Sequence, residues 1–518
     1  MNIVTIEIMR RIDRIAIDEM GISGIELMHN AGEGVARVTA RIFNDMELDG
    51  TIVVFTGPGN NGGDGWVVAR LLNREKYNVR VITTVNPDQL KGDARTAFEE
   101  ANADNIDFEL FDHLKIDYEN IAFAVDALLG TGAKGAPRGE IANIVRALSE
   151  FKIPTVAVDN PTGTDADTGQ VEGLAVPAIA TVSLCLPKIG QLLSPTREFV
   201  GELFVADIGI PDEAISKGRA GLDLRMNTPS EFGAMLPFRP SDGHKGTFGK
   251  VSIIAGSLGM TGAAALSAES ALRSGSGLVE LVVPEGIAKN IDSIVREVVT
   301  RPVAHVAKRG CLSVRALGEI LTCIKSSDAI AFGPGIGTHR ETIDLTSRLF
   351  QRITIPSVID ADGLNCIAKL KSRNIDIHFG SEVIITPHPG ELSRLLDISI
   401  DEVSKGRFTM ISDWARKLGV DVLVLKGSPT VIAEGEGPIF INQTGNDGMA
   451  TGGSGDILTG IIAGFLAQGL KPLESARLGV FIHGLAGDMA EETLGRRAMI
   501  AGDILDSLPS ALMALEEI

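Results

Sequence analysis

Short apolar runs alternate with longer amphipathic stretches along the whole chain. In the first two hundred residues the apolar runs are nearly continuous, which is typical of strands buried on both faces of a parallel sheet. Polar and apolar positions repeat at helical spacing over residues 64–75 and 139–150. Because such runs and helices alternate, the pattern predicts a parallel sheet of the Rossmann kind. We expect its strands at residues 51–56, 79–84, 121–126, 154–159, 181–186 and 203–207.

A segment of different character separates the two halves of the chain. Residues 211–243 carry four prolines and little periodicity, so we interpret them as a connecting segment. We place the boundary near residue 218, which gives domains at residues 1–218 and 219–518. No segment repeats between the halves, so two different α/β folds are predicted rather than a duplication. Beyond the boundary we expect strands at residues 250–255, 278–283, 328–332, 356–360, 382–386 and 421–425.

Length and composition agree with a globular protein of at least two domains. The chain has 518 residues, which is more than a single hydrophobic core normally supports. Hydrophobic residues make up 44% and charged residues 22%, a balance that excludes a wholly disordered chain. Glycine accounts for 59 of the 518 residues, about 11% against a usual ~7%. This excess indicates tight turns and close approaches between backbone and ligand.

Charge and cysteine content exclude several classes of function. With 48 basic and 67 acidic residues, the net charge of −19 argues against a nucleic-acid binder. The first residues lack a signal-peptide core, and no apolar run approaches the ~20 residues that span a bilayer. We therefore expect a cytoplasmic protein without a membrane partner. The four cysteines show neither CxxC pairing nor zinc spacing, as in proteins of a reducing compartment: Cys185, Cys311, Cys323 and Cys366.

A glycine-rich run, GPGNNGGDG, follows the first expected strand at residues 57–65. Gly57, Gly59 and Gly62 satisfy G-x-G-x-x-G between a strand and a helix, where helix N–H groups bind anions. The next strand ends in threonine and valine, so the acid that binds a ribose in ordinary NAD dehydrogenases is missing. The alternative is a glycine-rich turn without a ligand.

Two aspartates stand where parallel strands are expected to end. Asp126 precedes ALLGTG and Asp159 precedes NPTG. Because ligands bind at the carboxyl ends of such strands, both positions suit a metal ligand or an acid–base group. Oxygen ligands of this kind would suit a hard cation rather than zinc. The alternative for each aspartate is the capping of a helix.

Four runs of this half resemble the NAD(P)H-hydrate epimerase domain, over nearly all of residues 1–210. They are LMHNAG (27–32), GPGNNGGDG, VDALLGTG (125–132) and VDNPTGTDADTG (158–169). The resemblance implies that the hydrated nicotinamide nucleotide contacts Asn60, Asn61, Gly62, Gly63, Asp64, Gly130, Thr131, Gly132, Ala133, Lys134, Gly135 and Ala136.

The same resemblance implies a K⁺ ion near Asn61, Asp126 and Thr162, and substrate contact or acid–base work by Asp159. The chain departs from the family pattern at His29, Asn160 and Thr162, where the family usually has glutamate, isoleucine and serine. A threonine at position 162 keeps the hydroxyl ligand.

The second half contains its own glycine-rich run, TGNDGMATGGSGD, at residues 444–456, followed by an apolar helix. Free N–H groups that open a helix make an anion hole for a phosphoryl group in transfer. Asp456 at the mouth of this hole would take a proton from an attacking hydroxyl or hold it in line. A helix cap is the alternative for Asp456.

Other polar groups follow neighbouring strands of the second half. KGSPT begins at Lys426 and supplies a charge and hydroxyls suited to nucleotide phosphates, and GPGIG begins at Gly333. DADGLN at residues 360–365 would organise Mg²⁺ or cap a helix. TPHPGE at residues 386–391 contains His388, for which a structural role between two prolines is the alternative.

This set resembles the ribokinase-like superfamily and, more closely, the ADP/ATP-dependent NAD(P)H-hydrate dehydratase domain. HKGTFGKVSIIAGS at residues 244–257 is the diagnostic run, and the resemblance spans residues 240–510. It places Ala263, Gly335 and His388 at the hydrated substrate, with Asp456 as the catalytic carboxylate, and Mg²⁺ with the nucleotide. It implies nucleotide contacts from Lys426, Gly427, Ser428, Pro429, Thr430, Asn446, Asp447, Gly448, Met449, Ala450, Thr451, Gly452, Gly453, Ser454 and Gly455.

Both resemblances imply one substrate, which predicts a bifunctional enzyme that repairs hydrated NADH and NADPH. The first domain would epimerise the R and S hydrates at C6. The second would dehydrate the S form with consumption of ADP or ATP, and the sequence favours neither nucleotide. A homo-oligomer is expected from the resemblance alone. The rival interpretation is a ribokinase-like kinase of a small molecule, fused to a non-catalytic nucleotide-binding or scaffold domain.

Overall fold

The computed structural model describes residues 1–112 and 116–517. The chain divides into two compact units, Asn2–Asp223 and Leu224–Ile518 with Met1. The boundary expected near residue 218 falls at the end of helix α7 (Asp212–Gly218). This helix belongs to the first unit, because it packs on α1 (Ile6–Arg14) and the Nε of Arg11 donates to the carbonyl oxygen of Gly218. In the described residues, no helix is both long and apolar enough to cross a bilayer.

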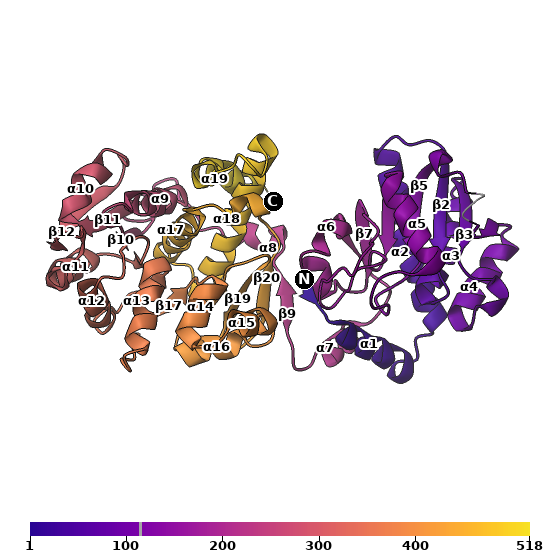
Figure 1. Ribbon diagram of the computed structural model, residues 1–518, viewed down its shortest axis with the longest axis horizontal. Coiled ribbons are helices and arrows are strands. Elements are labelled where there is room, and N and C mark those ends of the chain that lie inside the picture. Colours follow the sequence, from indigo (N-terminus) through magenta and orange to yellow (C-terminus); the bar gives the residue numbers. More distant parts are fainter. Residues whose placement is uncertain (113–115, 518) are drawn as a thin grey trace. The chain divides into compact units, whose positions relative to one another are not determined.

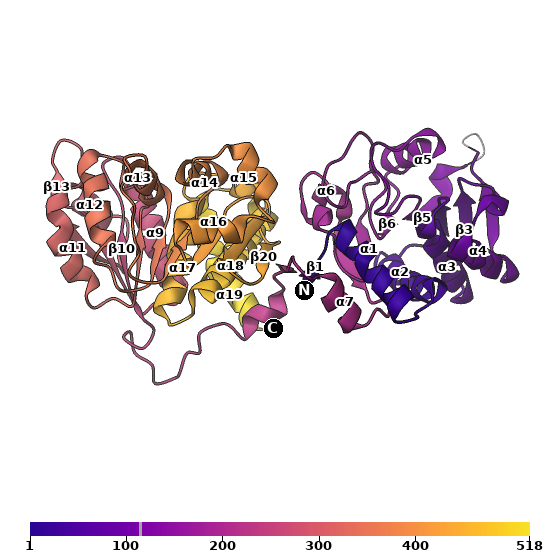
Figure 2. The same cartoon turned by 90° about the horizontal axis from the view of Figure 1, so that it is seen from below.

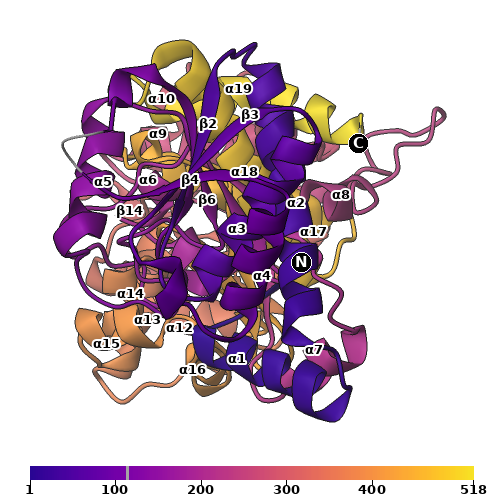
Figure 3. The ribbon, with the colours of Figure 1, turned by 90° about the vertical axis from the view of Figure 1, so that its right-hand side faces the viewer.

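The first unit is a parallel sheet between two layers of helices. Its strands follow the order β4–β3–β2–β5–β6–β7–β8, and each neighbouring pair is parallel. Figure 3 shows α5 on one side of these strands and α2, α3 and α4 on the other. The strands are β2 (Thr51–Thr56), β3 (Asn78–Thr83), β4 (Asp107–Leu110), β5 (Ile121–Ala127), β6 (Thr155–Val158), β7 (Ala180–Leu184) and β8 (Glu202–Ala206). The remaining helices are α2 (Gly24–Asp45), α3 (Asn60–Arg74), α4 (Gly92–Ala103), α5 (Gly139–Glu150) and α6 (Arg197–Val200).

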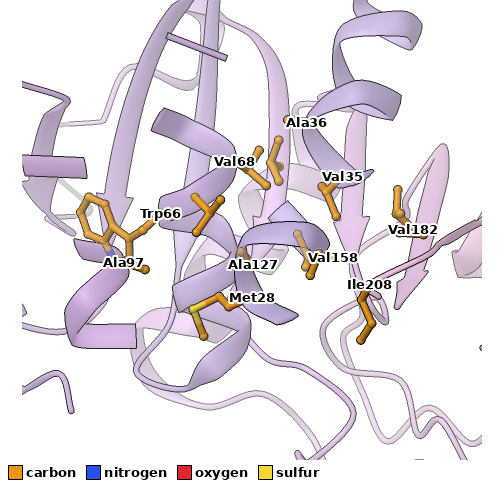
Figure 4. Packing of buried hydrophobic residues seen from close by; sticks show 14 of the residues in the cluster. Met28, Val35, Ala36, Trp66, Val68, Ala97, Ala127, Val158, Val182 and Ile208 are labelled. Carbon is orange, nitrogen blue, oxygen red and sulfur yellow. The ribbon is translucent and has the colours of Figure 1, made fainter. Parts of the chain in front are cut away.

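Apolar side chains of α2 and α3 pack against the sheet and form the larger core of this unit (Figure 4). Val35 from α2 and Val68 from α3 are fully buried, as is Trp66. The Trp66 ring meets Phe98 of α4 edge to face, with the ring centroids 5.0 Å apart. This packing holds α3, and with it the glycine-rich run at the start of α3, in a fixed place on the sheet.

The second unit is also a mostly parallel sheet, in the order β9–β20–β19–β18–β17–β16–β15–β10–β11–β12. Strands β18, β19 and β20 pair antiparallel with one another, and the strands from β18 through β10 to β12 pair parallel. The strands of this sheet are β9 (Leu224–Met226), β10 (Lys250–Ile254), β11 (Leu278–Pro284), β12 (Val299–Val303), β15 (Ala329–Phe332), β16 (Ser357–Ile359), β17 (Val383–Ile385), β18 (Val422–Leu425), β19 (Thr430–Glu434) and β20 (Ile439–Asn442). Two further strands, β13 (His305–Val306) and β14 (Cys311–Leu312), form a separate antiparallel pair.

Helices cover both faces of this second sheet (Figures 1 and 2). On one face α9, α17 and α18 contribute to the main core, and on the other α11 and α16 contact strands. The helices are α8 (Pro229–Gly233), α9 (Thr261–Arg273), α10 (Glu285–Asp292), α11 (Leu317–Ile324), α12 (Arg340–Phe350), α13 (Ala361–Lys371), α14 (Pro389–Leu396), α15 (Ile400–Gly406), α16 (Ile411–Leu418), α17 (Ser454–Ala467), α18 (Pro472–Leu494) and α19 (Ala501–Glu516).

The expected α/β fold is confirmed in both units, and the structure adds elements that the sequence did not predict. The segment 211–243, expected to lack regular structure, contains the short elements α7, β9 and α8. Strand β4 was not expected, because acidic and apolar residues alternate in its short sequence DFEL, which is at most partly buried at the edge of the sheet. Strands β12, β13 and β14 and the hairpin of β19 and β20 were not expected either.

Candidate active sites

The glycine-rich run of the first unit starts a helix. α3 begins at Asn60, so residues 60–64 are helical, whereas the sequence had placed them in a loop before a helix at residue 64. A Cβ atom on Gly57 would lie 1.9 Å from the carbonyl oxygen of Leu128, and one on Gly62 would lie 2.0 Å from the carbonyl oxygen of Gly57. These glycines are therefore required by the close approach of backbone to backbone. The first N–H groups of α3 have no partner within the helix and can bind an anion.

Gly62→Ala is expected to lower the free energy of unfolding of the first unit by about 3 kcal/mol, because the backbone must move to admit the methyl group. The matched control is Gly59→Ala, whose Cβ would meet no atom within 4 Å and whose φ is −99°. It should cost less than about 1 kcal/mol. Chemical denaturation of the two variants measures the difference. Equal losses would contradict the steric explanation.

Asp126 lies near the end of β5, where it is fully buried. Its Oδ2 accepts a hydrogen bond from the Thr162 N–H at 2.8 Å, and its Oδ1 accepts from the Thr162 hydroxyl at 2.7 Å and from the Leu128 N–H at 3.2 Å. Burial raises the pKa of Asp126 to about 6, and these hydrogen bonds oppose the rise. No helix begins beside Asp126 in the described chain, so the capping alternative is wrong for this residue.

Asn61 lies against the turn that follows Asp126. A Cβ atom on Gly130 would lie 3.2 Å from the Oδ1 of Asn61, so the absence of a side chain at Gly130 leaves room beside this amide. Among the residues that the structure describes, the buried Nδ2 of Asn61 has no hydrogen-bond partner. Together with Asp126 and Thr162, Asn61 supplies carboxylate, hydroxyl and amide oxygens. This donor set suits a hard cation.

Asp159 follows β6 and has a left-handed backbone, with φ at 62°. Its Oδ1 lies 2.5 Å from the Nζ of Lys188 and also accepts from the Leu184 N–H at 3.1 Å. The side chain of Gln191 donates to its carbonyl oxygen at 2.5 Å. As at Asp126, no helix starts beside Asp159 in the described chain, so the capping alternative is wrong here too.

Two further carboxyl groups share this region. Burial, followed by the charge of Asp159, raises the pKa of Asp64 well above its ordinary value of 3.8. Burial also raises the pKa of Asp13 to about 6, which Lys188 opposes and Asp159 increases. The structure therefore gathers predicted residues Asp64 and Asp159 with Asp13 and Lys188, neither of which the sequence had indicated.

Some predicted residues of the first unit lie apart from this cluster. The turn with Thr131, Gly132, Ala133, Lys134, Gly135 and Ala136 is partly or fully exposed. A Cβ atom on Gly135 would lie 3.7 Å from the Oε2 of Glu172, and the Cβ of Ala136 approaches Gly173. Their contact with substrate stays a prediction.

In the second unit, an ion pair joins the ends of β16 and β18, the strands on either side of β17. Asp360, the residue after β16, is 1% exposed. Its Oδ1 accepts from the Nζ of Lys426 at 2.7 Å and its Oδ2 from the hydroxyl of Thr459 at 2.8 Å. Asp360 precedes α13, yet its side chain does not cap that helix. Asp362, the other acid of this run, accepts from the Gly337 N–H at 2.9 Å.

Asp456 stands in the first turn of α17, within reach of these charges. Burial raises the pKa of Asp456 to about 7, Asp360 adds to the rise, and Lys426 opposes it. A Cβ atom on Gly455 would lie 3.2 Å from the Nζ of Lys426, so the two predicted nucleotide-binding segments meet here. The N-cap of α17 is Gly453, and no side chain caps this helix end in the described part of the chain. The capping alternative for Asp456 is therefore wrong.

The loop before α17 is anchored by α18. Asp488 accepts hydrogen bonds from the N–H of Gly445 at 2.8 Å and from the side-chain amide of Asn446 at 3.1 Å. Farther along, the hydroxyl of Ser454 lies 3.2 Å from the Nε2 of His483. Burial lowers the pKa of His483 to about 4, so this imidazole is neutral at physiological pH. Sequence reasoning missed both α18 residues, although the polar HGLAGD run within an apolar helix could have indicated them.

His388 caps α14, which is a structural role, and its contact with substrate stays a prediction. Its Nδ1 accepts from the Gly390 N–H at 3.0 Å, while its half-exposed ring keeps Nε2 3.5 Å from Glu391. Burial, followed by Lys426, lowers the pKa of His388. Elsewhere, a Cβ atom on Gly335 would lie 3.1 Å from the Cβ of Ala263, so these two predicted substrate residues are neighbours.

Comparison with known proteins covers both units. The sequence model for NAD(P)H-hydrate dehydratase matches residues 251–510, and the model for the YjeF-related protein N-terminus matches residues 24–190. The chain is 40% identical to the bifunctional NAD(P)H-hydrate repair enzyme Nnr of Moorella thermoacetica, over 100% of this chain and 98% of the relative. It is 37% identical to the Nnr enzyme of Thermofilum pendens, over 100% and 97%.

This chain belongs to the family of bifunctional NAD(P)H-hydrate repair enzymes. A solved structure that is also similar is the ADP/ATP-dependent NAD(P)H-hydrate dehydratase of Bacillus subtilis, co-crystallised with ATP and Mg²⁺. It is 28% identical, with a TM-score of 0.49, and the match covers 57% of this chain and 99% of that one.

Membership of the repair-enzyme family confirms the function that the sequence predicted. The first unit is the epimerase domain and the second is the dehydratase domain. The rival interpretation, a small-molecule kinase fused to a scaffold, does not account for a relationship that runs the length of the chain. The roles of individual residues, the potassium ion, the homo-oligomer and the cytoplasmic location stay predictions.

Proposed function

We propose that Asp159 and Asp456 are the catalytic carboxylates of the two reactions. Asp159 follows a parallel strand and is buried beside Lys188, whereas Asp456 lies partly buried in the first turn of α17, close to Lys426. In both units a carboxylate near a lysine would act on the C6 hydroxyl group of the hydrate, for epimerisation in the first unit and for dehydration in the second. The observation that carries the proposal is the convergence of Lys426, Asp360 and Asp456 at the free N–H groups of α17.

In the first unit, the R and S hydrates differ at C6, so a bond to this carbon must break and re-form on the other face. Asp159 takes the proton of the C6 hydroxyl, and the C6–N1 bond breaks with its electron pair held on N1 and the conjugated carboxamide. Closure on the opposite face returns the proton to the C6 oxygen. Asn61, Asp126 and Thr162 would hold a K⁺ ion, which would fix the loops around the substrate phosphates.

In the second unit, Asp456 takes the proton of the C6 hydroxyl, and the oxygen attacks the terminal phosphorus of ADP or ATP. AMP or ADP leaves, and the N–H groups at the start of α17 stabilise the charge of the phosphoryl group in transfer. The N1 lone pair then expels phosphate from C6, and loss of a proton from C5 forms the C5=C6 bond. Lys426 would hold nucleotide phosphates, and Asp362 is the carboxylate whose place suits the accompanying Mg²⁺.

Incubation with a mixture of R and S NADH hydrate, Mg²⁺, K⁺ and either ADP or ATP tests this proposal. Recovery of the reduced-nicotinamide absorbance should run to completion for both epimers, and the faster nucleotide identifies the phosphoryl donor. A reaction that stops when the S form is used up would contradict epimerisation by the first unit. Complete conversion that needs no nucleotide would contradict phosphoryl transfer in the second.

A further inference from the structure

Lys188 is a buried cation that the proposed reactions do not yet use. It is 1% exposed, and its Nζ contacts the Oδ1 of Asp159 at 2.5 Å, the carbonyl oxygen of Leu184 at 2.8 Å and the hydroxyl of Ser183 at 3.3 Å. Burial of an ammonium group costs several kcal/mol unless it is paired and hydrogen-bonded. Because Lys188 is paired with the carboxylate that we assign to catalysis, its burial indicates a functional role rather than a contribution to stability alone.

The backbone around this pair is held from several sides. Both Asp159 and Cys185 have left-handed conformations, with φ at 62° and 64°, which are uncommon for residues other than glycine. Strained residues of this kind persist only where the surrounding structure fixes them. Val4 provides part of that support: its N–H donates to the carbonyl oxygen of Pro187, and its carbonyl oxygen accepts from the Ile189 N–H, both at 3.0 Å. The segment with Lys188 is thereby locked between its neighbours.

The titratable groups that face Asp159 come from three elements. Asp13 on α1 and Asp64 on α3 are carboxyl groups, and the Cys185 thiol follows β7 with Lys188. Burial raises the pKa of Cys185 to about 12, so the thiol carries no charge at neutral pH. Lys188 is therefore the cation of the group, and its ammonium is hydrogen-bonded to Asp159 rather than to Asp13 or Asp64.

We propose that Lys188 is a positioning residue for epimerisation, which orients the carboxyl group of Asp159 and places an opposite charge beside it. The proposal rests on the role assigned to Asp159 above. Because Oδ1 receives the hydrogen bonds from Lys188 and Leu184, Oδ2 is the atom that takes the proton of the C6 hydroxyl. Without the ammonium group, the Asp159 carboxylate would lose the opposite charge and the hydrogen bond that Lys188 supplies.

The test compares the full-length enzyme with Lys188→Met, Lys188→Gln and Lys188→Arg. Epimerisation is measured as formation of the S hydrate from the R hydrate, without nucleotide, between pH 5 and pH 10. We expect Lys188→Met and Lys188→Gln to lose about 100-fold at pH 7, and their acid limbs to move up by ~1–3 pH units. Lys188→Arg should keep the wild-type acid limb because it keeps the charge. Lys91→Met, at an exposed lysine of the same unit, is the matched control.

Dehydration of pure S hydrate by the second unit provides an internal control in every variant and should not change. Loss of epimerisation by the same factor at every pH, with the acid limb in place, would overturn the proposal and leave Lys188 a purely structural role. Asp159→Asn distinguishes the role assigned to Asp159 from the role proposed for Lys188. If that variant still epimerises, the assignment of Asp159 fails; if it is inactive and Lys188→Met has an unshifted profile, only the inference about Lys188 fails. Lys188→Gln decides the outcome if Lys188→Met does not fold.

Discussion

Replacing Asp456 by asparagine is expected to slow dehydration of the S hydrate by about 10²–10⁴-fold, the range typical for loss of a general base. The substitution keeps the size of the side chain and its place in the first turn of α17, so the anion hole should remain. Epimerisation should be unchanged, since Asp456 belongs to the second unit. Steady-state rates with pure S hydrate and saturating nucleotide give the measurement, and R-to-S conversion in the same preparation shows that the protein is folded.

The pH dependence of dehydration follows from the same residue. Burial raises the pKa of Asp456 to about 7, so the carboxylate that accepts the proton is fully formed only above that pH. The rate should therefore rise about tenfold per pH unit below 7 and level off above it. In Asp456→Asn this limb should disappear. Asp506→Asn, an exposed position on α19, is the matched control and should keep both the rate and the limb. A wild-type acid limb that persists in Asp456→Asn would assign the base to another group.

Lys426→Met is expected to lower the free energy of unfolding by about 3 kcal/mol. The substitution leaves the carboxylate of Asp360 in a place where it is 1% exposed, without its ammonium partner at 2.7 Å. Removal of one member of a buried pair costs about 3–5 kcal/mol, and the lower end applies because the Lys426 side chain is itself 21% exposed. Urea denaturation measures the loss. Nucleotide affinity should fall with it, because Lys426 lies beside Gly455 at the start of α17.

A double variant distinguishes the cost of the unpaired Asp360 carboxylate from the cost of losing the packing of the Lys426 side chain. Asp360→Asn combined with Lys426→Met removes both charges, and stability should then recover by about 2 kcal/mol relative to Lys426→Met alone. Lys405→Met provides the control, since its partner Asp401 is solvent-exposed and the exposed pair contributes less than about 1 kcal/mol. If the double variant were as unstable as the single one, the cost would lie in the lost packing of the lysine side chain.

The strand-end residues were predictable because they depend on local order along the chain. A buried strand that runs into a polar turn places Asp126 and Asp159 at the reactive edge of a sheet, and a glycine-rich run before an apolar helix places Asp456 in the first turn of that helix. The paired glycines at positions 57 and 62 were likewise readable, although their helix begins earlier than the sequence indicated. Periodicity identifies elements well, but it does not fix the residue at which a helix begins.

The residues that surround these carboxylates could not be predicted from local sequence patterns. Lys188 and His483 are buried only because distant segments cover them, and a lone lysine or histidine in a sequence is more often exposed or structural. Asp360 was recognised as one of a pair of acids, but its contacts with Lys426 and Thr459 join residues 66 and 99 positions apart. Long-range pairing of this kind requires the sheet order, which the sequence pattern does not give.

The contact of Val4 with the segment that carries Lys188 affects where a fragment of the epimerase domain should begin. The matched family region of this half begins at residue 24, whereas Val4 and Asp13 lie before it. A fragment trimmed to that region would retain every residue of the glycine-rich run and both strand-end aspartates. It would lose the backbone hydrogen bonds between Val4 and the segment that carries Lys188, and it would lose Asp13. A fragment with the limits of the matched family region would therefore lack residues that surround Asp159.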